Sequence, residues 1–407
     1  MAGEAGTAGG SGSAKPRAAE DGAVLPGGTV GVLGGGQLGR MLGQAARRMG
    51  YRFVVFDPQA GCPAAAVADE QIVADYDDAA ALRRFAGRVD VVTFEFENVP
   101  AGPLAGLAET VAVRPSPKVL ETCRHRAEEK RFVEACGAAV APWRACATAD
   151  EARSAGEAVG GRGVMKTAEF GYDGKGQRRF DSAGEAAAAW EELGGVACVA
   201  EGWVDFDREV STLVARSPSG EAAVYPVVEN RHVRHILDTT LAPAPGLSEA
   251  LAEEARRVAR SIAERVALEG LLAVEMFVVG GSRLVVNELA PRPHNSGHYT
   301  IEACVTDQFE QQLRAVCGLP LGDASMKVGA AAMGNLLGEV YRPELVTPTV
   351  PAWAGLLGDP EVKLHLYGKR DARAGRKMGH VTATGGDVAS ALRRVEAARE
   401  KLGWRAG

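Results

Sequence analysis

The sequence predicts a multidomain protein that combines α/β and α+β architecture. At 407 residues the chain is long enough for two or three domains of ordinary size. Short apolar runs alternate with helix-periodic segments in the first third, whereas strand-like runs lie close together in pairs after about residue 160. The composition, 46% hydrophobic and 24% charged, is typical of globular proteins and excludes collagen-like, coiled-coil and mostly disordered chains.

The first part of the chain predicts a tail followed by a doubly wound domain. Residues 1–28 are rich in glycine and alanine, lack the apolar core of a signal peptide and carry acids that transit peptides avoid, so we expect a disordered tail. The strand-like and helix-periodic segments that follow are Thr29–Leu33, Leu38–Met49, Arg52–Asp57, Ala79–Arg88 and Asp90–Phe94. Strands that alternate with helices form βαβ units, which predict a parallel sheet over residues 29–115.

The rest of the chain predicts an α+β domain over residues 116–325 and a small β-rich C-terminal domain over residues 326–400. In the α+β domain, Leu271–Val279 and Leu284–Leu289 are strand-like and flank a Gly-Gly pair, which predicts a hairpin. From about residue 325 onward, short Val- and Leu-containing runs are broken by Pro and Gly, as expected for short strands and turns.

Charge and cysteine content narrow the class of ligand. The 46 Lys and Arg and 52 Asp and Glu residues give a net charge of −6, so we expect neither nucleic acid nor a membrane surface as partner. No run approaches the ~18–20 apolar residues of a membrane span. The seven cysteines contain no C-x-x-C pair, which favours a reducing, cytoplasmic location; a plastid stays open if the source is photosynthetic. The expected ligand is a small molecule.

A first glycine loop follows the first strand. Gly34, Gly36 and Gly39 match G-x-G-x-x-G, and Asp57 ends the second strand. This spacing is typical of dinucleotide sites, where glycines admit a pyrophosphate and the acid binds a ribose hydroxyl. Two other interpretations are a tight strand-to-helix turn and a cradle for a different phosphate. Taken alone, the loop suggests an NAD enzyme.

A second glycine loop has a different pattern. Lys166 ends a strand and precedes Gly171, Gly174 and Gly176, with Lys175 inside the loop. Backbone N–H groups of such a loop can close over a triphosphate whose charge the lysines offset. It is not a G-x-x-x-x-G-K-[ST] loop, because the lysine comes first. The simpler alternative is a glycine-rich hairpin turn.

Two carboxylates lie on the arms of the predicted hairpin. If Val279 opposes Ser282, then Glu275 opposes Val286 and is diagonal to Glu288, so both acids share one face of the sheet. Buried acids need a cation or another partner. Carboxylates together with nucleotide phosphates are the usual ligands of Mg²⁺. The alternative is a pair of exposed edge acids.

Five motifs in this order resemble one enzyme family. They are Gly31–Met41, Thr93–Val99, Gly171–Gln177, Asn287–His298 and Gly375–His380. A lysine strand, a glycine loop and two late carboxylates resemble the ATP-grasp superfamily, and the five motifs together resemble the N5-carboxyaminoimidazole ribonucleotide synthetases. The resemblance implies that residues 116–325 form an ATP-grasp domain. It also implies carboxylation of 5-aminoimidazole ribonucleotide with ATP and bicarbonate, through carboxyphosphate, in purine biosynthesis.

The resemblance also implies a set of site residues. ATP is expected at Arg126, Lys166, Gly171, Tyr172, Asp173, Gly174, Lys175, Gly176, Gln177, Glu201, Gly202, Trp203, Val204, Glu209, His232, Asn287 and Glu288. The ribonucleotide and bicarbonate are expected at Gly36, Gln37, Tyr172, Asp173, Arg292, His294, Asn295, Ser296, Lys369, Arg376 and Lys377. The expected catalytic residues are Lys369, Arg376, His294 and Arg292, and the expected ligands of Mg²⁺ or Mn²⁺ are Glu275 and Glu288.

Two other enzyme classes remain to be compared with this hypothesis. A sibling ATP-grasp ligase would use formate or another carboxylate, and an NAD-dependent oxidoreductase would use the first glycine loop. The resemblance reassigns that loop to the ribonucleotide side of the cleft, with no nicotinamide. It also implies a homodimer and a functional or fused partner, the mutase that acts on N5-carboxyaminoimidazole ribonucleotide.

Overall fold

The computed structural model describes residues 22–169, 171, 176–341 and 350–403. Most of the predicted tail, residues 1–21, lies outside the described part of the chain. Residues 22–28 do not behave as a tail, because they pack on the folded body. The Val24 N–H donates to the Cys317 carbonyl at 2.8 Å, and the Tyr51 hydroxyl donates to the Val24 carbonyl at 2.7 Å.

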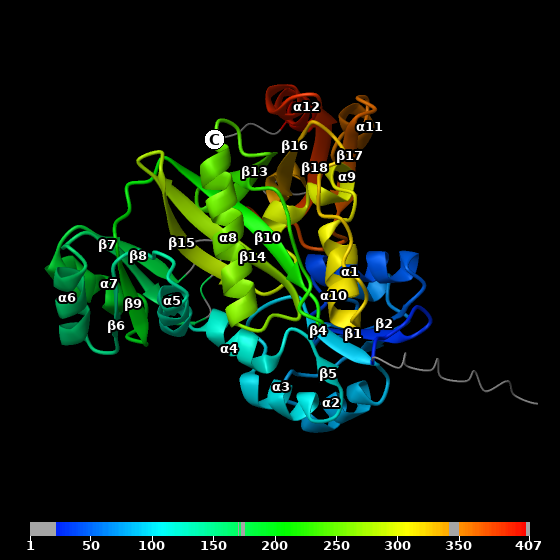
Figure 1. Cartoon of the computed structure of the whole chain (residues 1–407), viewed down its shortest axis with the longest axis horizontal. Coiled ribbons are helices and arrows are strands. Elements are labelled where there is room, and N and C mark those ends of the chain that lie inside the picture. The colour runs from blue at the N-terminus through cyan, green and yellow to red at the C-terminus, as the bar shows by residue number, and fades with distance from the viewer. Residues whose placement is uncertain (1–21, 170, 172–175, 342–349, 404–407) are drawn as a thin grey trace, which may run out of the picture.

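The N-terminal part is the predicted doubly wound domain. Its strands are β1 (Thr29–Leu33), β2 (Arg52–Phe56), β3 (Glu70–Ile72), β4 (Val91–Phe94) and β5 (Ala112–Val113), in the order β3-β2-β1-β4-β5, all parallel. Its helices are α1 (Gln37–Arg48), the 3₁₀ helix η1 (Pro63–Ala66), α2 (Ala79–Ala86) and α3 (Ala101–Ala108). The strands are apolar runs buried on both faces, as parallel sheets require. This domain forms the lower right of Figure 1.

A small antiparallel sheet follows two linking helices. The helices are α4 (Pro117–Arg124) and α5 (Arg126–Ala135), and the chain is extended between them because the Arg126 N–H donates to the Ala168 carbonyl at 2.9 Å. The sheet has the order β6-β9-β7-β8. Its elements are β6 (Trp143–Cys146), α6 (Ala149–Ala158), β7 (Gly163–Thr167), β8 (Gln177–Phe180), α7 (Ala183–Glu192) and β9 (Cys198–Gly202).

A long antiparallel sheet runs through the rest of the chain. Its order is β15-β14-β10-β12-β13-β16-β18-β17, with β11 paired to β10, so the predicted C-terminal β region continues the central sheet through β13 and β16. The strands are β10 (Arg208–Arg216), β11 (Ala222–Val224), β12 (Val228–Val233), β13 (Ile236–Ala242), β14 (Gly270–Val279), β15 (Arg283–Ala290), β16 (Ala330–Leu337), β17 (Val362–Leu366) and β18 (Lys377–Gly385).

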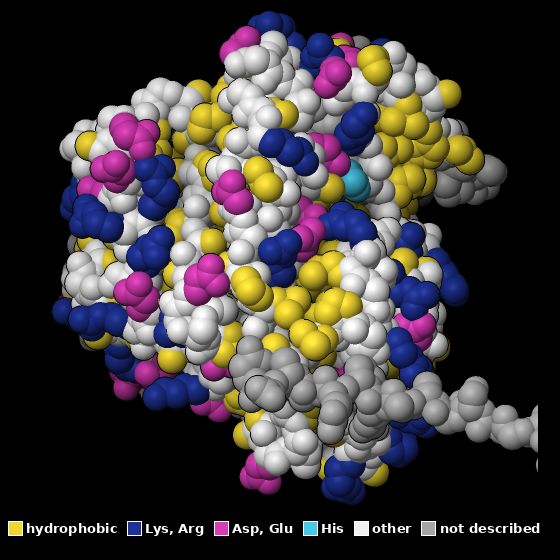
Figure 2. Space-filling model, turned by 45° about the vertical axis from the view of Figure 1, so that its right-hand side comes forward, with side chains coloured by type: hydrophobic (Ala, Val, Ile, Leu, Met, Phe, Trp, Pro, Cys, Tyr) yellow, Lys and Arg dark blue, Asp and Glu magenta, His cyan; other side chains and the backbone are white. Residues whose placement is uncertain are grey.

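Helices cover this sheet and join it to the N-terminal domain. They are α8 (Glu249–Arg265), η2 (Asn295–Gly297), α9 (Thr300–Ala303), α10 (Gln308–Cys317), η3 (Gly338–Tyr341), α11 (Trp353–Leu356) and α12 (Val388–Glu400). Helix α8 lies across the strands β10, β14 and β15, and α10 lies between that sheet and α1 (Figure 1). Among the described residues, none of the helices combines the length and apolar character that crossing a bilayer requires. On the face drawn in Figure 2, basic and acidic side chains are interspersed.

The predicted hairpin is present, but its predicted register is wrong. Val279 opposes Arg283 rather than Ser282, because the turn has three residues instead of two. This shift alone would place Asn287 opposite Glu275 and turn Glu288 to the other face. A β-bulge between Glu275 and Met276 corrects it, so Glu275 directly opposes Glu288. The shared face is therefore as predicted, but the two carboxylates are closer neighbours than the diagonal pair we expected.

A buried histidine cluster joins the long sheet to the segment after β15. His380 stacks on His365 with ring centroids 4.5 Å apart and lies 4.7 Å from the ring of His298. The Tyr367 hydroxyl lies 2.9 Å from Nδ1 of His380. Burial holds the pKa of His298 and that of His380 well below the usual range, so both rings are neutral in the folded protein.

This cluster predicts a specific loss of stability in acid. Below about pH 6.5 the unfolded chain binds protons that the buried His298 and His380 exclude, so stability falls as the pH falls. We expect His380→Phe to reduce the slope of unfolding free energy against pH by up to about 1.4 kcal/mol per pH unit. Urea unfolding of the variant and the wild type between pH 5 and 7.5 measures the difference. His235→Gln, on the exposed turn after β12, is the control, and equal slopes for His380→Phe and wild type would contradict the prediction.

Candidate active site

Three buried charges link the small sheet to helix α5. Glu201 on β9 accepts a hydrogen bond from Lys166 on β7 at 3.0 Å and forms an ion pair with Lys130 on α5 at 3.1 Å. Burial alone would raise the pKa of Glu201, but the two ammonium groups hold it at about 2. Burial lowers the pKa of Lys166, and Glu201 offsets this only in part. Two cations around one anion leave a net positive site, as a bound triphosphate requires.

Backbone hydrogen bonds hold the segment after Glu201, which was predicted to be a hinge, in one path. The Gly202 N–H donates to the Pro142 carbonyl at 2.7 Å, and the Trp203 N–H donates to the Arg162 carbonyl at 2.9 Å. A Cβ on Gly202 would lie 2.8 Å from the Val159 carbonyl oxygen, so only glycine fits there. These bonds fix the path of the strand into Val204. In the glycine loop, Gly171, Gly176 and Gln177 are described, and the predicted residues Tyr172, Asp173, Gly174 and Lys175 lie outside the described part of the chain.

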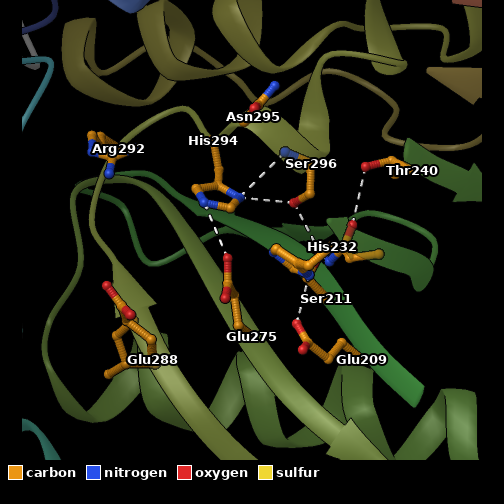
Figure 3. Close-up of polar contacts among 12 residues, drawn as sticks. Glu209, Ser211, His232, Thr240, Glu275, Glu288, Arg292, His294, Asn295 and Ser296 are labelled. Carbon is orange, nitrogen blue, oxygen red and sulfur yellow. Dashed lines mark hydrogen bonds and ion pairs between the residues drawn. The ribbon is translucent and has the colours of Figure 1, made fainter. Parts of the chain in front are cut away.

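A histidine and a carboxylate pair on the long sheet. Nδ1 of His232 on β12 lies 2.8 Å from Oε2 of Glu209 on β10 (Figure 3). Burial lowers the pKa of His232, but Glu209 reverses this and leaves the pKa raised. The two residues sit at the same end of neighbouring strands, near a bulge between Arg231 and His232. The structure therefore brings these two predicted residues together.

The opposed pair Glu275 and Glu288 is the centre of the site. Burial raises the pKa of Glu275, and the charge of Glu288 raises it further. Arg126 of α5 approaches Oε2 of Glu288 to 3.6 Å and so connects this pair to the Lys130 and Lys166 region. Among the residues that the structure describes, no group of three or more His, Cys, Asp or Glu side chains forms a metal cage. Two facing carboxylates with Asn287 in the bulge fit a divalent cation that takes its other ligands from phosphates.

The segment after β15 brings three predicted residues to this pair. Nε2 of His294 lies 3.1 Å from Oε1 of Glu275, and its Nδ1 lies 2.8 Å from the Ser296 hydroxyl (Figure 3). Burial and the neighbouring Arg292 hold the pKa of His294 well below its usual range. Arg292 forms an ion pair with Glu97 of the N-terminal domain at 2.7 Å. Arg292 and His294 therefore line the space beside the carboxylates.

Asn295 has a different position from its two neighbours. Its amide forms a reciprocal pair with the amide of Asn335 on β16, with distances of 3.1 and 2.8 Å. Asn335 also donates to the Leu237 carbonyl at 2.6 Å. Both amides are buried. The geometry gives Asn295 a role in holding the segment in place.

The basic residues of the C-terminal region divide into two groups. Lys377 lies near enough to lower the pKa of both Glu275 and His294, and Lys369 donates to the Lys377 carbonyl at 2.8 Å. Arg376 contacts its own loop, where it donates to the Asp371 carbonyl at 2.9 Å. The structure therefore brings Lys377 near Glu275, ties Lys369 to the backbone of Lys377, and leaves Arg376 in contact with its own loop.

The first glycine loop is occupied by the protein itself. The carboxylate of Glu95, after β4, accepts hydrogen bonds from the N–H groups of Gly36 and Gly39, the latter at 2.7 Å. A Cβ on Gly36 would lie 2.5 Å from that carboxylate. Asp57 accepts from the Gly35 N–H at 2.7 Å. The helix N-terminus that would bind a pyrophosphate already holds an anion, which argues against a dinucleotide site.

The sequence-based prediction did not include four charged residues near the site. The helical periodicity of α5 could have indicated two of them. Glu129 and Lys130 are buried on α5, at the spacing that places them on the same face as Arg126 and Val133. Two charges among the buried positions of a helix indicate partners inside the fold. The other two, Glu95 and Glu97, lie in the Thr93–Val99 motif, where no periodicity distinguishes them from loop acids.

Comparisons with known proteins match three parts of the chain. Residues 28–124 match the ribonucleotide synthetase preATP-grasp domain, residues 131–309 the ATP-grasp domain, and residues 331–394 the phosphoribosylaminoimidazole carboxylase C-terminal domain. These matches confirm the predicted fold class: a parallel-sheet domain, a central ATP-grasp domain and a C-terminal domain.

Individual relatives agree with the domain matches. The chain is 46% identical over 361 residues to the N5-carboxyaminoimidazole ribonucleotide synthase of Brucella melitensis, covering 88% of this chain and 97% of the relative. A solved ADP complex of an N5-carboxyaminoimidazole ribonucleotide synthetase superposes with a TM-score of 0.86 at 41% identity, covering 93% of this chain and 97% of the other. An Aspergillus clavatus enzyme complexed with ADP and 5-aminoimidazole ribonucleotide gives 0.84 at 30% identity, covering 93% and 99%. The chain belongs to the N5-carboxyaminoimidazole ribonucleotide synthase family.

Proposed function

We propose that this chain carboxylates 5-aminoimidazole ribonucleotide in purine biosynthesis. ATP, bicarbonate and 5-aminoimidazole ribonucleotide give ADP, phosphate and N5-carboxyaminoimidazole ribonucleotide. The observation that carries the proposal is the position of the Glu275 and Glu288 pair. On one side it reaches the Lys130, Lys166 and Glu201 group through Arg126, and on the other it contacts His294. A phosphate donor and an anionic acceptor can therefore meet at this pair.

The ATP side of the site is assigned to the residues that link the two sheets. Lys130 and Lys166 offset phosphate charge, and the fixed hinge from Glu201 to Val204 suits the adenine edge, because strand backbone can pair with a planar base. Glu209 accepts from ribose hydroxyls, and His232 keeps its carboxylate in position at 2.8 Å. The described ends of the glycine loop and Gln177 close over the phosphates in this assignment.

Mg²⁺ or Mn²⁺ would be held by Glu275 and Glu288, with Asn287 as a possible further oxygen ligand. A divalent cation bound there offsets charge on the phosphates of ATP. The protein's own contribution is to keep the two carboxylates opposed, where burial and the charge of Glu288 raise the pKa of Glu275.

The acceptor side is assigned to residues that bind anions. In the first step, a bicarbonate oxygen forms a bond to the γ-phosphorus and the bond from that phosphorus to ADP breaks, which leaves carboxyphosphate. Arg292 and Lys369 orient bicarbonate for this attack, and His294 holds the Glu275 carboxylate in place beside them at 3.1 Å. In the second step, the amine nitrogen of the ribonucleotide takes the carboxyl group, phosphate leaves and the amine loses a proton. Arg376 and Lys377 are assigned to the anions of this side, with Gly36 and Gln37 around the ribonucleotide.

The two rival enzyme classes find less support. The NAD interpretation needs the first glycine loop, whose N–H groups bind Glu95. The formate alternative is disfavoured because relatives that match most of this chain are N5-carboxyaminoimidazole ribonucleotide synthases. A homodimer, a mutase partner and a cytoplasmic location stay as predictions from the resemblance.

The decisive assay measures ADP release with each acceptor in turn. We expect release to require bicarbonate and to rise when 5-aminoimidazole ribonucleotide is added. Formate in place of bicarbonate should give only background release. Bicarbonate-dependent release that the ribonucleotide does not stimulate would contradict the assigned substrate.

Glu288→Gln tests the metal assignment. The change removes one charge from the cation site, so we expect kcat to fall by about 100-fold or more. The unfolding temperature without metal should stay the same or rise, because the variant relieves repulsion with Glu275. Glu264→Gln, on the exposed side of α8, makes the same charge change away from the site and is the control. An unchanged kcat for Glu288→Gln would refute the assignment.

Arg376→Ala tests the acceptor side. Loss of this guanidinium should raise the KM for ribonucleotide or bicarbonate by about 10-fold or more, with the KM for ATP nearly constant. Steady-state kinetics with each substrate varied separately measure the three values. Arg373→Ala, exposed in the same loop, should leave all three unchanged. If Arg376→Ala changed only the KM for ATP, the assignment of Arg376 to the acceptor side would be wrong.

A further inference from the structure

A row of buried polar side chains leads from the interior of the long sheet to the carboxylate pair. Ser211 on β10, Asn230 on β12, Thr240 on β13 and Ser296 in η2 are each at most 6% exposed. The strand register places Ser211 opposite Glu275 and Asn230 opposite Thr240. Buried polar groups are costly unless they are hydrogen-bonded, so their arrangement on one face requires an explanation.

The side chains form one continuous chain of hydrogen bonds (Figure 3). Thr240 bonds to Asn230 at 3.0 Å, Asn230 to Ser211 at 2.8 Å, and Ser211 to Ser296 at 2.9 Å. Ser296 lies 2.8 Å from Nδ1 of His294, whose Nε2 lies 3.1 Å from Oε1 of Glu275. The chain therefore ends at a residue assigned to the metal.

A backbone group fixes the direction of these bonds. The Ser296 N–H points to Nδ1 of His294 at 3.3 Å, and a backbone N–H can only donate. Nδ1 is therefore an acceptor, and the proton of the neutral ring is on Nε2, where it is donated to Glu275. The Ser296 hydroxyl must then donate to Nδ1 and accept from Ser211. Ser211 in turn accepts from the amide nitrogen of Asn230, whose oxygen accepts from Thr240.

We propose that Ser211, Asn230, Thr240 and Ser296 are positioning residues that lock His294 in its Nε2–H tautomer and thereby orient the Glu275 carboxylate. Every bond in the row points the same way, so each donor has one acceptor. If the row were reversed, Nδ1 of His294 would carry the proton, and the Ser296 N–H would then face another hydrogen. Oε1 of Glu275 is then occupied by His294, so Oε2 is the oxygen that would hold the cation. The inference rests on the proposed function, because it assigns Glu275 to the metal.

Nitrogen NMR of histidine side chains tests the lock without metal or substrate. Long-range proton–nitrogen spectra distinguish Nε2–H from Nδ1–H tautomers, and the signal missing in His294→Gln identifies His294. We expect a single Nε2–H tautomer in the wild type and a mixture in Ser211→Ala. Thr212→Val is the matched control: it removes a buried hydroxyl from the same strand, but one that donates to the Tyr225 carbonyl at 2.8 Å.

A second measurement tests the consequence for the cation. Binding of Mn²⁺ in the presence of ATP, followed by electron paramagnetic resonance, should weaken about 10-fold or more in Ser211→Ala and stay unchanged in Thr212→Val. If Ser211→Ala does not fold, Thr240→Val keeps the shape and removes only the first donor, and Thr240→Ser should restore the wild-type spectrum.

The results separate this inference from the proposed function. A mixed or Nδ1–H tautomer in the wild type overturns the lock, as does a Ser211→Ala spectrum equal to that of the wild type. An altered tautomer with unchanged Mn²⁺ binding overturns the orientation of Glu275. None of these three results would contradict the proposed carboxylation, which the ADP-release assay tests separately. If that assay failed, the tautomer measurement would still test the lock.

Discussion

The site depends on two carboxylates that the backbone forces to face each other. Glu275 and Glu288 are direct partners across β14 and β15, and burial together with the charge of Glu288 raises the pKa of Glu275. A cation held by the two carboxylates would offset their repulsion. The surrounding residues therefore either supply positive charge, as Arg126 does, or hold the carboxylates in place, as His294 does. In the proposed function, the same repulsion would favour binding of a divalent ion.

Positive charge is concentrated inside a protein whose net charge is −6. Lys130 and Lys166 are held on one buried acid, Glu201, and Arg292 is held on Glu97. Each acid keeps a cation in position, so the folded chain does not bury an unpaired charge. When an anionic ligand arrives, these cations gain a second partner without having to be ordered, which lowers the cost of binding.

The sequence could predict which residues gather, but not how their strands align. Alternating patterns and a Gly-Gly pair identify the hairpin, since each signal is local. Its register depends on a three-residue turn and on a bulge at Asn287. Beside the bulge, the Val286 N–H donates to the Ala139 carbonyl at 2.7 Å, a contact from a distant part of the chain. No local signal reports such a partner. The same holds for Glu95, which fills the first glycine loop from another strand end and converts an apparent nucleotide motif into an internal cap.

The C-terminal region reaches the site although it lies far along the long sheet. Five strand intervals separate β14 from β18, which in a flat sheet would be about 24 Å. Lys377 at the start of β18 nevertheless lies near enough to influence the pKa of Glu275. The segment after β15 connects the two ends of the sheet: its Asn295 pairs with Asn335 on β16, and the ring of its His298 lies 4.7 Å from that of His380 on β18. Lys377 and the Glu275–Glu288 pair thus belong to one hydrogen-bonded sheet, and the contacts of this segment bring its distant strands to the same site.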